Sequence, residues 1–193
     1  MPNSRELVFA TNNPHKLYEV SRILSPRFTL LSLKDINCYD EIPEDFTTLQ
    51  ENASQKAWYI YNKYKKNCFA DDTGLEVDIL NGEPGVFSAR YAGDDKNPAQ
   101  NIVKLLQNLQ GKENRKARFR TVIALVLDGK EFLFEGKVEG SIIEIPRGID
   151  GFGYDPVFLP EGFNQTFAEM DIALKNSISH RGRAIEKLAT FLL

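Results

Sequence analysis

The sequence predicts an α/β protein built on a mixed sheet with flanking helices. Two observations indicate this class. Short apolar runs alternate with stretches of helical periodicity, beginning with a strand, a turn and a helix. Later, two long strand-like runs at 117–127 and 131–138 are joined by Asp128-Gly129, which is a strong hairpin signal. A hairpin among alternating strands and helices favours a mixed sheet over an all-parallel one.

Each expected element has a local signal. Asn13 has the side chain of an N-cap, and Pro14 suits the first helical position. Asn81-Gly82 marks a turn, and residues 148–155 form a glycine-rich loop. The expected strands cover residues 7–10, 28–33, 68–70, 75–80, 117–127 and 131–138, and the expected helices begin near Pro14, Thr48, Asn97 and Ser179.

Composition and charge narrow the class further. The 193 residues suffice for one domain, or one domain with lobes, so we treat 1–193 as a single domain. The formal net charge is −3, whereas a protein that coats nucleic acid is usually basic. The apolar run at 7–10 is too short for a signal peptide or a membrane span. Cys38 and Cys68 lack a CxxC spacing, so we expect a soluble, cytoplasmic protein with two structural thiols.

The first candidate site is residues 11–16, Thr-Asn-Asn-Pro-His-Lys, where the opening strand gives way to a helix. A helix N-terminus offers N–H groups and the positive end of the helix dipole, which suit phosphate. The Thr and Asn side chains add donors, and Lys16 adds positive charge. The segment lacks the glycines of a P-loop. An ordinary capped turn is the alternative interpretation.

The second candidate site is the pair Asp71 and Asp72, which follows the apolar run 68–70. We expect an acidic turn at the end of that strand, at the rim of the sheet, where α/β proteins place their sites. Because side chains alternate along a strand, the two carboxylates should point to different sides. Mg²⁺ takes one or two protein carboxylates together with water and phosphate oxygens. A solvated acidic turn is the alternative interpretation.

Two later segments combine groups that suit a nucleoside. Residues 152–156, Phe-Gly-Tyr-Asp-Pro, join two aromatic rings, which can stack on a base, to a carboxylate. Lys175 and the run 179–181, Ser-His-Arg, place positive charge at a helix start, where it opposes the dipole unless an acceptor binds. A packed loop and a capped helix are the alternatives. For the basic run at 115–120 we expect a solvated strand face.

Six segments occur in one order between residues 7 and 193: residues 11–16, Glu51–Ala57, Asp71–Leu75, Gly85–Tyr91, Phe152–Pro156 and Ser179–Gly182. Together they resemble the inosine/xanthosine triphosphate pyrophosphatases, the house-cleaning enzymes for noncanonical purine nucleotides. Each segment alone is weak, but all six in order are highly specific. The resemblance implies a mixed α/β fold with two lobes around a central nucleotide-binding cleft, a homodimer and Mg²⁺ as cofactor.

The resemblance also implies the reaction and its catalytic group. ITP, dITP or XTP would be hydrolysed to the monophosphate and pyrophosphate. Carried over by motif, Asp72 is the catalytic base and a metal ligand. Glu44 is the second metal carboxylate, and Glu41 and Glu51 stay open because the spacing of residues 40–50 varies.

A substrate site follows from the same resemblance. Donors from His180 and Arg181 aimed at a 6-oxo group would be left unpaired by adenine, which a polar site can reject by roughly 10⁴-fold. Two positions depart from common members, since Thr73 stands for a frequent serine and Asn12 for a common glycine. The triphosphate would contact Thr11, Asn12, Asn13, Lys16, Lys56 and Thr73, and the nucleoside would contact Phe152, Gly153, Tyr154, Asp155, Lys175, His180 and Arg181.

Three other functions compete with this one. Residues 152–156 and 179–182 disfavour a pyrophosphatase for modified pyrimidine triphosphates. Intact Asp72, Lys16 and Lys56 disfavour a non-catalytic nucleotide sensor. The acidic pI of about 5.5 disfavours a nucleic-acid-binding module that uses the 115–120 strip.

Overall fold

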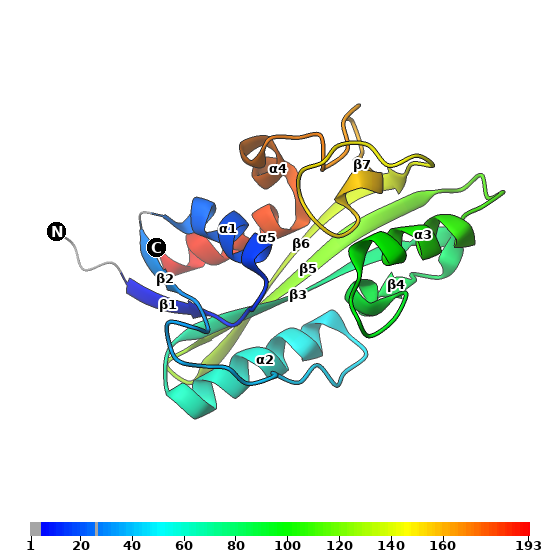
Figure 1. Cartoon of the computed structure of the whole chain (residues 1–193). Helices are drawn as coiled ribbons and strands as arrows, with labels where there is room; N and C mark the ends of the chain where they lie inside the picture. Colours follow the sequence, from blue (N-terminus) through cyan, green and yellow to red (C-terminus); the bar gives the residue numbers. More distant parts are fainter. Residues whose placement is uncertain (1–4, 26) are drawn as a thin grey trace. The chain divides into compact units, whose positions relative to one another are not determined.

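The computed structural model describes residues 5–25 and 27–193. Its elements alternate in the way the sequence predicted, with strands and helices interleaved along the chain (Figure 1). The strands are β1 (Arg5–Phe9), β2 (Phe28–Leu31), β3 (Cys68–Val77), β4 (Pro84–Gly85), β5 (Lys116–Leu127), β6 (Lys130–Ile142) and β7 (Phe158–Pro160). The α-helices are α1 (Pro14–Leu24), α2 (Leu49–Tyr64), α3 (Pro98–Asn108), α4 (Ile172–Ile178) and α5 (His180–Leu192).

The seven strands form one mixed sheet. Its order is β2-β1-β3-β5-β6-β7, and β4 pairs with β3 off this path. β1 runs parallel to β2 and β3, whereas the pairs β3–β4 and β6–β7 are antiparallel. β5 and β6 are joined by Asp128 and Gly129, both at positive φ, which is the geometry of a two-residue hairpin turn. The predicted mixed sheet with flanking helices is confirmed.

The chain divides into two compact units. The first comprises the described residues up to 72 together with 121–136 and 181–193, and the second comprises 73–120 and 137–180. β3, β5 and β6 each contribute residues to both units. This division agrees with the expectation of lobes, and the nucleotide-binding cleft stays a prediction. No helix in the described residues is long and apolar enough to cross a membrane.

In the first unit, α1 and α5 pack against the sheet through one apolar cluster. Phe9 and Phe69 stack at its centre with ring centroids 4.5 Å apart. Cys68, the neighbour of Phe69, turns to the other face, where its Sγ donates to the carbonyl of Ala57 in α2 at 3.2 Å. Figure 1 shows α1 and α5 on one side of these strands and α2 on the other. Successive residues of β3 therefore face different helices.

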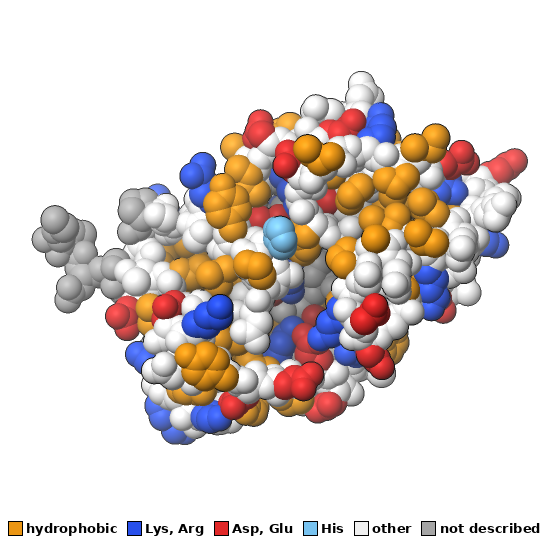
Figure 2. Space-filling model, in the orientation of Figure 1, with side chains coloured by type: hydrophobic (Ala, Val, Ile, Leu, Met, Phe, Trp, Pro, Cys, Tyr) orange, Lys and Arg blue, Asp and Glu red, His pale blue; other side chains and the backbone are white. Residues whose placement is uncertain are grey.

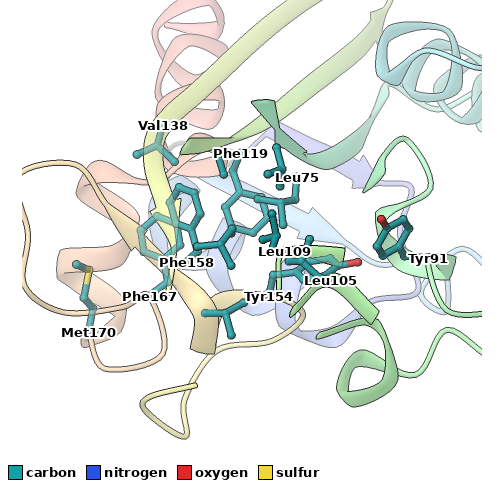
Figure 3. Close-up of a cluster of buried hydrophobic side chains, with 14 residues drawn as sticks. Leu75, Tyr91, Leu105, Leu109, Phe119, Val138, Tyr154, Phe158, Phe167 and Met170 are labelled. Carbon is teal, nitrogen blue, oxygen red and sulfur yellow. The ribbon is translucent and has the colours of Figure 1, made fainter. Parts of the chain in front are cut away.

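In the second unit, the core gathers around Phe119 of β5 (Figure 3). The Phe119 ring lies 4.7 Å from that of Phe158 and 4.6 Å from that of His180. α3 closes the cluster through Leu105, and Leu109 follows as the C-cap residue of the helix; both are fully buried. This helix begins as predicted, because the Asn97 side chain caps it by accepting from the N–H groups of residues 99 and 100.

The expected acidic turn at residues 70–74 is wrong. Asp71 and Asp72 lie in the middle of β3, which runs unbroken from Cys68 to Val77. Two separate strands are the natural expectation here because adjacent carboxylates are rarely buried. In the structure both are ion-paired with cationic side chains, which removes the need for a solvated turn. The strand expected at residues 75–80 also ends early, since residues 78–80 form a 3₁₀ turn. The seven-residue helix α4 was not predicted.

We expect neither cysteine to react with a thiol reagent in the folded protein. Cys38 and Cys68 are buried and form no disulfide. Burial raises the pKa of the Cys68 thiol to about 12, and the thiolate is the reactive form. Titration with a chromogenic disulfide near pH 8 should therefore detect no fast thiol in the native chain, and both thiols after denaturation. A fast-reacting native thiol would contradict this burial.

Candidate functional site

The adjacent carboxylates of β3 point to opposite faces of the sheet. Asp71 shares a face with Phe69, which packs under α1 and α5, and Asp72 shares a face with Cys68, which contacts α2. The ion pairs agree, because cations from α1 and α5 bind Asp71 and a cation from α2 binds Asp72. The prediction that the two carboxylates face different sides is confirmed.

Asp71 is the centre of a buried network of four charges in the first unit. Lys16 Nζ donates to its Oδ1 at 2.9 Å, and Arg181 Nε donates to its Oδ2 at 3.2 Å. Arg181 Nη1 also donates to Glu19 Oε2 at 2.5 Å. The Asp71 and Arg181 side chains are 1% and 3% exposed, so the network is shielded from solvent. It contains two positive and two negative groups, and it is therefore balanced in charge.

This network changes how two of its members titrate. Burial by itself would raise the pKa of Asp71, but Lys16 and Arg181 outweigh burial and hold that pKa well below its usual range. For Lys16, burial lowers the pKa more than Asp71 raises it. Asp71 is thus kept as a carboxylate whose two oxygens are already bonded. Such a group is suited to orienting cations and poorly suited to accepting a proton.

Asp72 belongs to a second cluster on the α2 side. Lys56 Nζ lies 3.3 Å from Asp72 Oδ1 and 2.5 Å from Glu44 Oε1. Asn52 Nδ2 donates to Asp72 Oδ2 at 3.4 Å. For Asp72, burial outweighs the attraction of Lys56 and raises the pKa. For Lys56, burial is outweighed by the attraction of Asp72 and Glu44, so its pKa is also raised. The two carboxylates of the same strand are therefore shifted in opposite directions.

The residues of this cluster fit a hard divalent cation. Glu44 and Asp72 converge on a single ammonium group, so both already face one centre of positive charge. Two carboxylates with room for water and phosphate oxygens are a usual Mg²⁺ ligand set. Within the described residues no group of three or more His, Cys, Asp and Glu side chains could hold a metal ion. Of the two alternatives to Glu44, Glu41 is exposed and Glu51 accepts from Thr48 in the capping box of α2.

The predicted phosphate segment adopts the expected strand-to-helix geometry. Asn13 Oδ1 accepts from the N–H groups of His15 and Lys16, at 3.0 and 3.2 Å, and so caps α1. Thr11 Oγ1 accepts from the Asn13 N–H, and Asn12 is exposed. Asn13 is therefore committed to the helix cap. The Lys16 ammonium faces Asp71, which makes it the link between this segment and β3.

In the second unit, the aromatic loop closes around a buried ion pair. Lys175 Nζ donates to Asp155 Oδ2 at 2.7 Å, and both side chains are 5% exposed or less. The same oxygen accepts from the Phe152 N–H at 2.8 Å. Lys175 Nζ also lies 5.0 Å from the centroid of the Phe152 ring. A Cβ on Gly151, which has φ +76°, would come 2.2 Å from Asp155 Oδ2, so this turn requires glycine.

Tyr154 and His180 are held within the core of the second unit. The Tyr154 hydroxyl donates to the Ser88 carbonyl at 2.8 Å, and burial raises the pKa of Tyr154. Ser88 Oγ in turn accepts from the Leu75 N–H and donates to the Gly85 carbonyl, which ties β3 to β4. The His180 ring stacks on Phe119.

Two predicted substrate residues remain to be placed. Gly153 follows Phe152 and has a φ of +62°, and Thr73 follows Asp72 and is half-buried.

The structure divides the predicted residues into two groups. Lys16, Lys56, Glu44 and Asp72 gather in the first unit, and Phe152, Tyr154, Asp155 and Lys175 gather in the second. Arg181 lies with Asp71 and Glu19, although the resemblance groups it with the nucleoside residues. Sequence reasoning did not select Glu19, Asn52 or Ser88. Glu19 stands three residues after Lys16, a spacing that places both on one helix face, and Asn52 and Ser88 lie inside two of the six segments.

Fold and charged clusters together define a mixed α/β protein whose central strand carries ion-paired carboxylates on both faces. The chain belongs to the Ham1 family, because that family's model matches residues 7–191. Two curated relatives are named dITP/XTP pyrophosphatase. That of Flavobacterium johnsoniae is 52% identical over 187 residues, and that of Bacillus subtilis is 46% identical over 192 residues. Each alignment covers 97% of both chains.

Solved structures resemble the fold over nearly its whole length. The Ham1 protein of Staphylococcus aureus matches with a TM-score of 0.88 and 38% identity. A HAM1 protein from Coxiella burnetii matches with a TM-score of 0.89, also at 38% identity. Both matches cover 97% of this chain and 98% of the other. The predicted family is therefore confirmed, together with its α/β class.

Proposed function

We propose that this protein hydrolyses ITP, dITP and XTP between the α and β phosphates, releasing the monophosphate and pyrophosphate. The observation that carries the proposal is the cluster in which the buried Lys56 joins Asp72 to the partly exposed Glu44. The names of the Flavobacterium johnsoniae and Bacillus subtilis relatives support the substrate class. Such an enzyme removes these nucleotides from the pool.

The hydrolytic step needs one proton acceptor and several positive charges. The oxygen of a water molecule attacks the α phosphorus, the bond from that phosphorus to the bridging oxygen breaks, and pyrophosphate leaves. Asp72 takes the proton of the water, since burial raises its pKa and makes it a better base than an exposed carboxylate. Asp71 is less suited to this task, because its ion pairs with Lys16 and Arg181 hold its pKa well below the usual range.

Cationic groups would neutralise the phosphate charge. Phosphoryl transfer depends on positioning and charge neutralisation more than on covalent help. We propose that Lys16 and Lys56 bind the triphosphate, together with donors from Thr11 and Asn12. Glu44 and Asp72 would hold Mg²⁺, which when bound supplies further charge neutralisation at the phosphates. Both carboxylates face the Lys56 ammonium, so a divalent ion would meet two ligand groups already directed at one centre of positive charge.

Base recognition would depend on the second unit. We propose that Phe152 stacks on the purine, and that Asp155 and Lys175 hold the Phe152 backbone and ring in place. Tyr154 and His180 are already fixed by the core of this unit. Donors from His180 and Arg181 would recognise the 6-oxo group that ITP and XTP share and ATP lacks.

Two further points complete the proposal. The resemblance alone supports a homodimer, which light scattering at two protein concentrations would test.

A nucleic-acid-binding function receives no support from the basic strip at residues 115–120. Arg118 pairs with Asp78 and Glu139, and Arg120 pairs with Glu76. These arginines are neutralised within the protein.

The test is a panel of nucleoside triphosphates incubated with the protein and Mg²⁺. We expect pyrophosphate and the monophosphate from ITP, dITP and XTP, and little product from ATP. Pyrophosphate and orthophosphate should be measured separately, because they distinguish cleavage at the α phosphorus from cleavage at the γ phosphorus. Orthophosphate as the first product, or equal turnover of ATP and ITP, would contradict the proposal.

A further inference from the structure

One face of α2 holds the segment 40–46, which carries Glu44, along the length of the helix. The contacts recur at helical spacing, and Figure 2 shows acidic and basic side chains intermingled over this part of the molecule. Glu44 is the proposed metal ligand of the segment, so whatever fixes the segment also fixes Glu44. From the end of α2 to its start, Lys63 and Tyr59 bind Asp40, Lys56 binds Glu44, Gln55 exchanges two hydrogen bonds with Asp45, and Asn52 exchanges two with Phe46.

Asn52 reaches Asp72 of β3, as Lys56 does, but it holds the segment through both backbone groups of Phe46. Its Oδ1 accepts from the Phe46 N–H at 2.9 Å, and its Nδ2 donates to the Phe46 carbonyl at 3.1 Å. The second Nδ2 hydrogen is directed at Asp72 Oδ2, at 3.4 Å. A primary amide has two donor hydrogens, and both are used here. Asn52 is only 2% exposed, so water does not compete for these bonds.

The three bonds of one amide join the two carboxylates that would bind the metal. Phe46 is two residues from Glu44, so pairing both of its backbone groups fixes the approach of Glu44 to the cluster. Asn52 holds Asp72 through Oδ2 and leaves Oδ1 to Lys56, which also binds Glu44. Two residues therefore fix the separation of Asp72 and Glu44. Lys56 binds both carboxylates directly, and Asn52 binds Asp72 and the backbone of Phe46, two residues from Glu44.

We propose that Asn52 is a positioning residue that sets the separation of Glu44 and Asp72 and so determines how tightly the protein binds its divalent cation. This inference rests on the proposed function. Only an amide can supply an acceptor to the Phe46 N–H and donors to both the Phe46 carbonyl and Asp72. An aspartate at this position lacks the donors and would repel Asp72 Oδ2, and an alanine leaves the backbone N–H and carbonyl of Phe46 and Asp72 Oδ2 without this partner.

The test compares Asn52→Asp, Asn52→Ala and Asn52→Gln with the wild type. Binding of Mn²⁺ and of Mg²⁺ is measured by calorimetry without nucleotide, and kcat and KM for ITP are measured across a Mg²⁺ series. Groups that orient metal ligands affect metal affinity or activity by about 10–100-fold. We therefore expect Asn52→Asp and Asn52→Ala to weaken metal binding and lower kcat by at least about 10-fold, with KM for ITP changed by less than about 3-fold. Asn52→Gln keeps the amide one methylene further out and should fall between them and the wild type.

Asn62→Ala is the matched control, because Asn62 is an exposed asparagine on the same helix. It should leave metal binding and kcat unchanged. Thermal unfolding of each variant separates a positioning role from loss of structure, and if Asn52→Ala or Asn52→Asp does not fold, Asn52→Gln decides. Folded Asn52 variants with wild-type metal affinity would overturn the inference while leaving the proposed function intact. A wild type that binds Mn²⁺ but releases no pyrophosphate from ITP would contradict the proposed function, and the calorimetry would still test Asn52.

Discussion

Replacing Asp72 by asparagine should lower kcat for ITP hydrolysis by at least about 100-fold, which is the low end of the contribution of a general base. Asparagine has nearly the same shape but cannot accept the proton of the attacking water. The fold should stay intact, because Lys56 keeps Glu44 as a partner and the Asn52 amide can still donate to the new carbonyl oxygen. The measurement is pyrophosphate release from ITP at saturating substrate, with the unfolding temperature recorded for the same sample.

Asp94→Asn is a suitable control for this substitution, since Asp94 is a solvent-accessible aspartate of the second unit. It makes the same chemical change on the surface and should leave kcat unaffected. A folded Asp72→Asn protein that turns over ITP at nearly the wild-type rate would remove Asp72 from the role of base. The Glu44 carboxylate would then be the next group to test.

The neighbouring substitution, Asp71→Asn, should destabilise the protein by about 3–5 kcal/mol, the usual cost of removing one partner from a buried ion pair. Asp71 is 2% exposed and binds Lys16 and Arg181. Without its charge, the network would hold two cations, of which Arg181 is fully buried, and only Glu19 as a carboxylate. Urea unfolding followed by circular dichroism gives the free energy of unfolding. A loss of less than about 1 kcal/mol, which is the range of a surface ion pair, would contradict the burial of this network.

A double substitution separates lost charge balance from lost shape. Lys16→Met removes one cation of the network while keeping most of the side-chain volume. In combination with Asp71→Asn it leaves one positive and one negative group, Arg181 and Glu19. The double variant should therefore be more stable than Asp71→Asn alone, because replacing both members of a buried pair is often nearly neutral. A double variant that is less stable than either single variant would show that packing, not charge, explains the loss.

The two aspartates are adjacent in sequence but should give opposite results, because they lie on opposite faces of β3. Asp71 faces α1 and α5, where two cations hold both of its oxygens and keep its pKa low. Asp72 faces α2, where burial dominates and raises its pKa. Asp71→Asn is thus expected mainly to lower the free energy of unfolding, and Asp72→Asn mainly to lower kcat.

Much of the fold was predictable because its signals are local. The helices α1, α2 and α3 begin where Asn13, Thr48 and Asn97 cap them, and each cap involves N–H groups only two or three residues further along the chain. The Asp128-Gly129 hairpin is equally local, since two residues at positive φ define it. The six segments are recognisable for the same reason, and their order along the chain is enough to indicate the family.

The errors have a common cause, which is that charge burial depends on distant partners. A strand through Asp71 and Asp72 is stable only because Lys16, 55 residues away from Asp71, and Arg181, 110 residues away from it, supply compensating charge. The sequence around Asp71 contains no trace of either partner, so a solvated turn was the natural expectation. For the same reason the neighbours of Arg181 do not reveal that Glu19 and Asp71 bind it, and its contact with the nucleoside stays a prediction.

The sequence by itself thus determined the α/β class, the helix starts, the family and the residue types available for phosphate chemistry, because caps, periodicity and motifs act over a few residues. Only the tertiary structure decided that the acidic pair lies inside a strand and that Asn52 joins Phe46 to Asp72. It also brought Glu44, and not the Thr48-bonded Glu51, to Lys56. The physical reason is the same in each case: a buried charge or amide is tolerated only when folding delivers its partners, and those partners are remote along the chain.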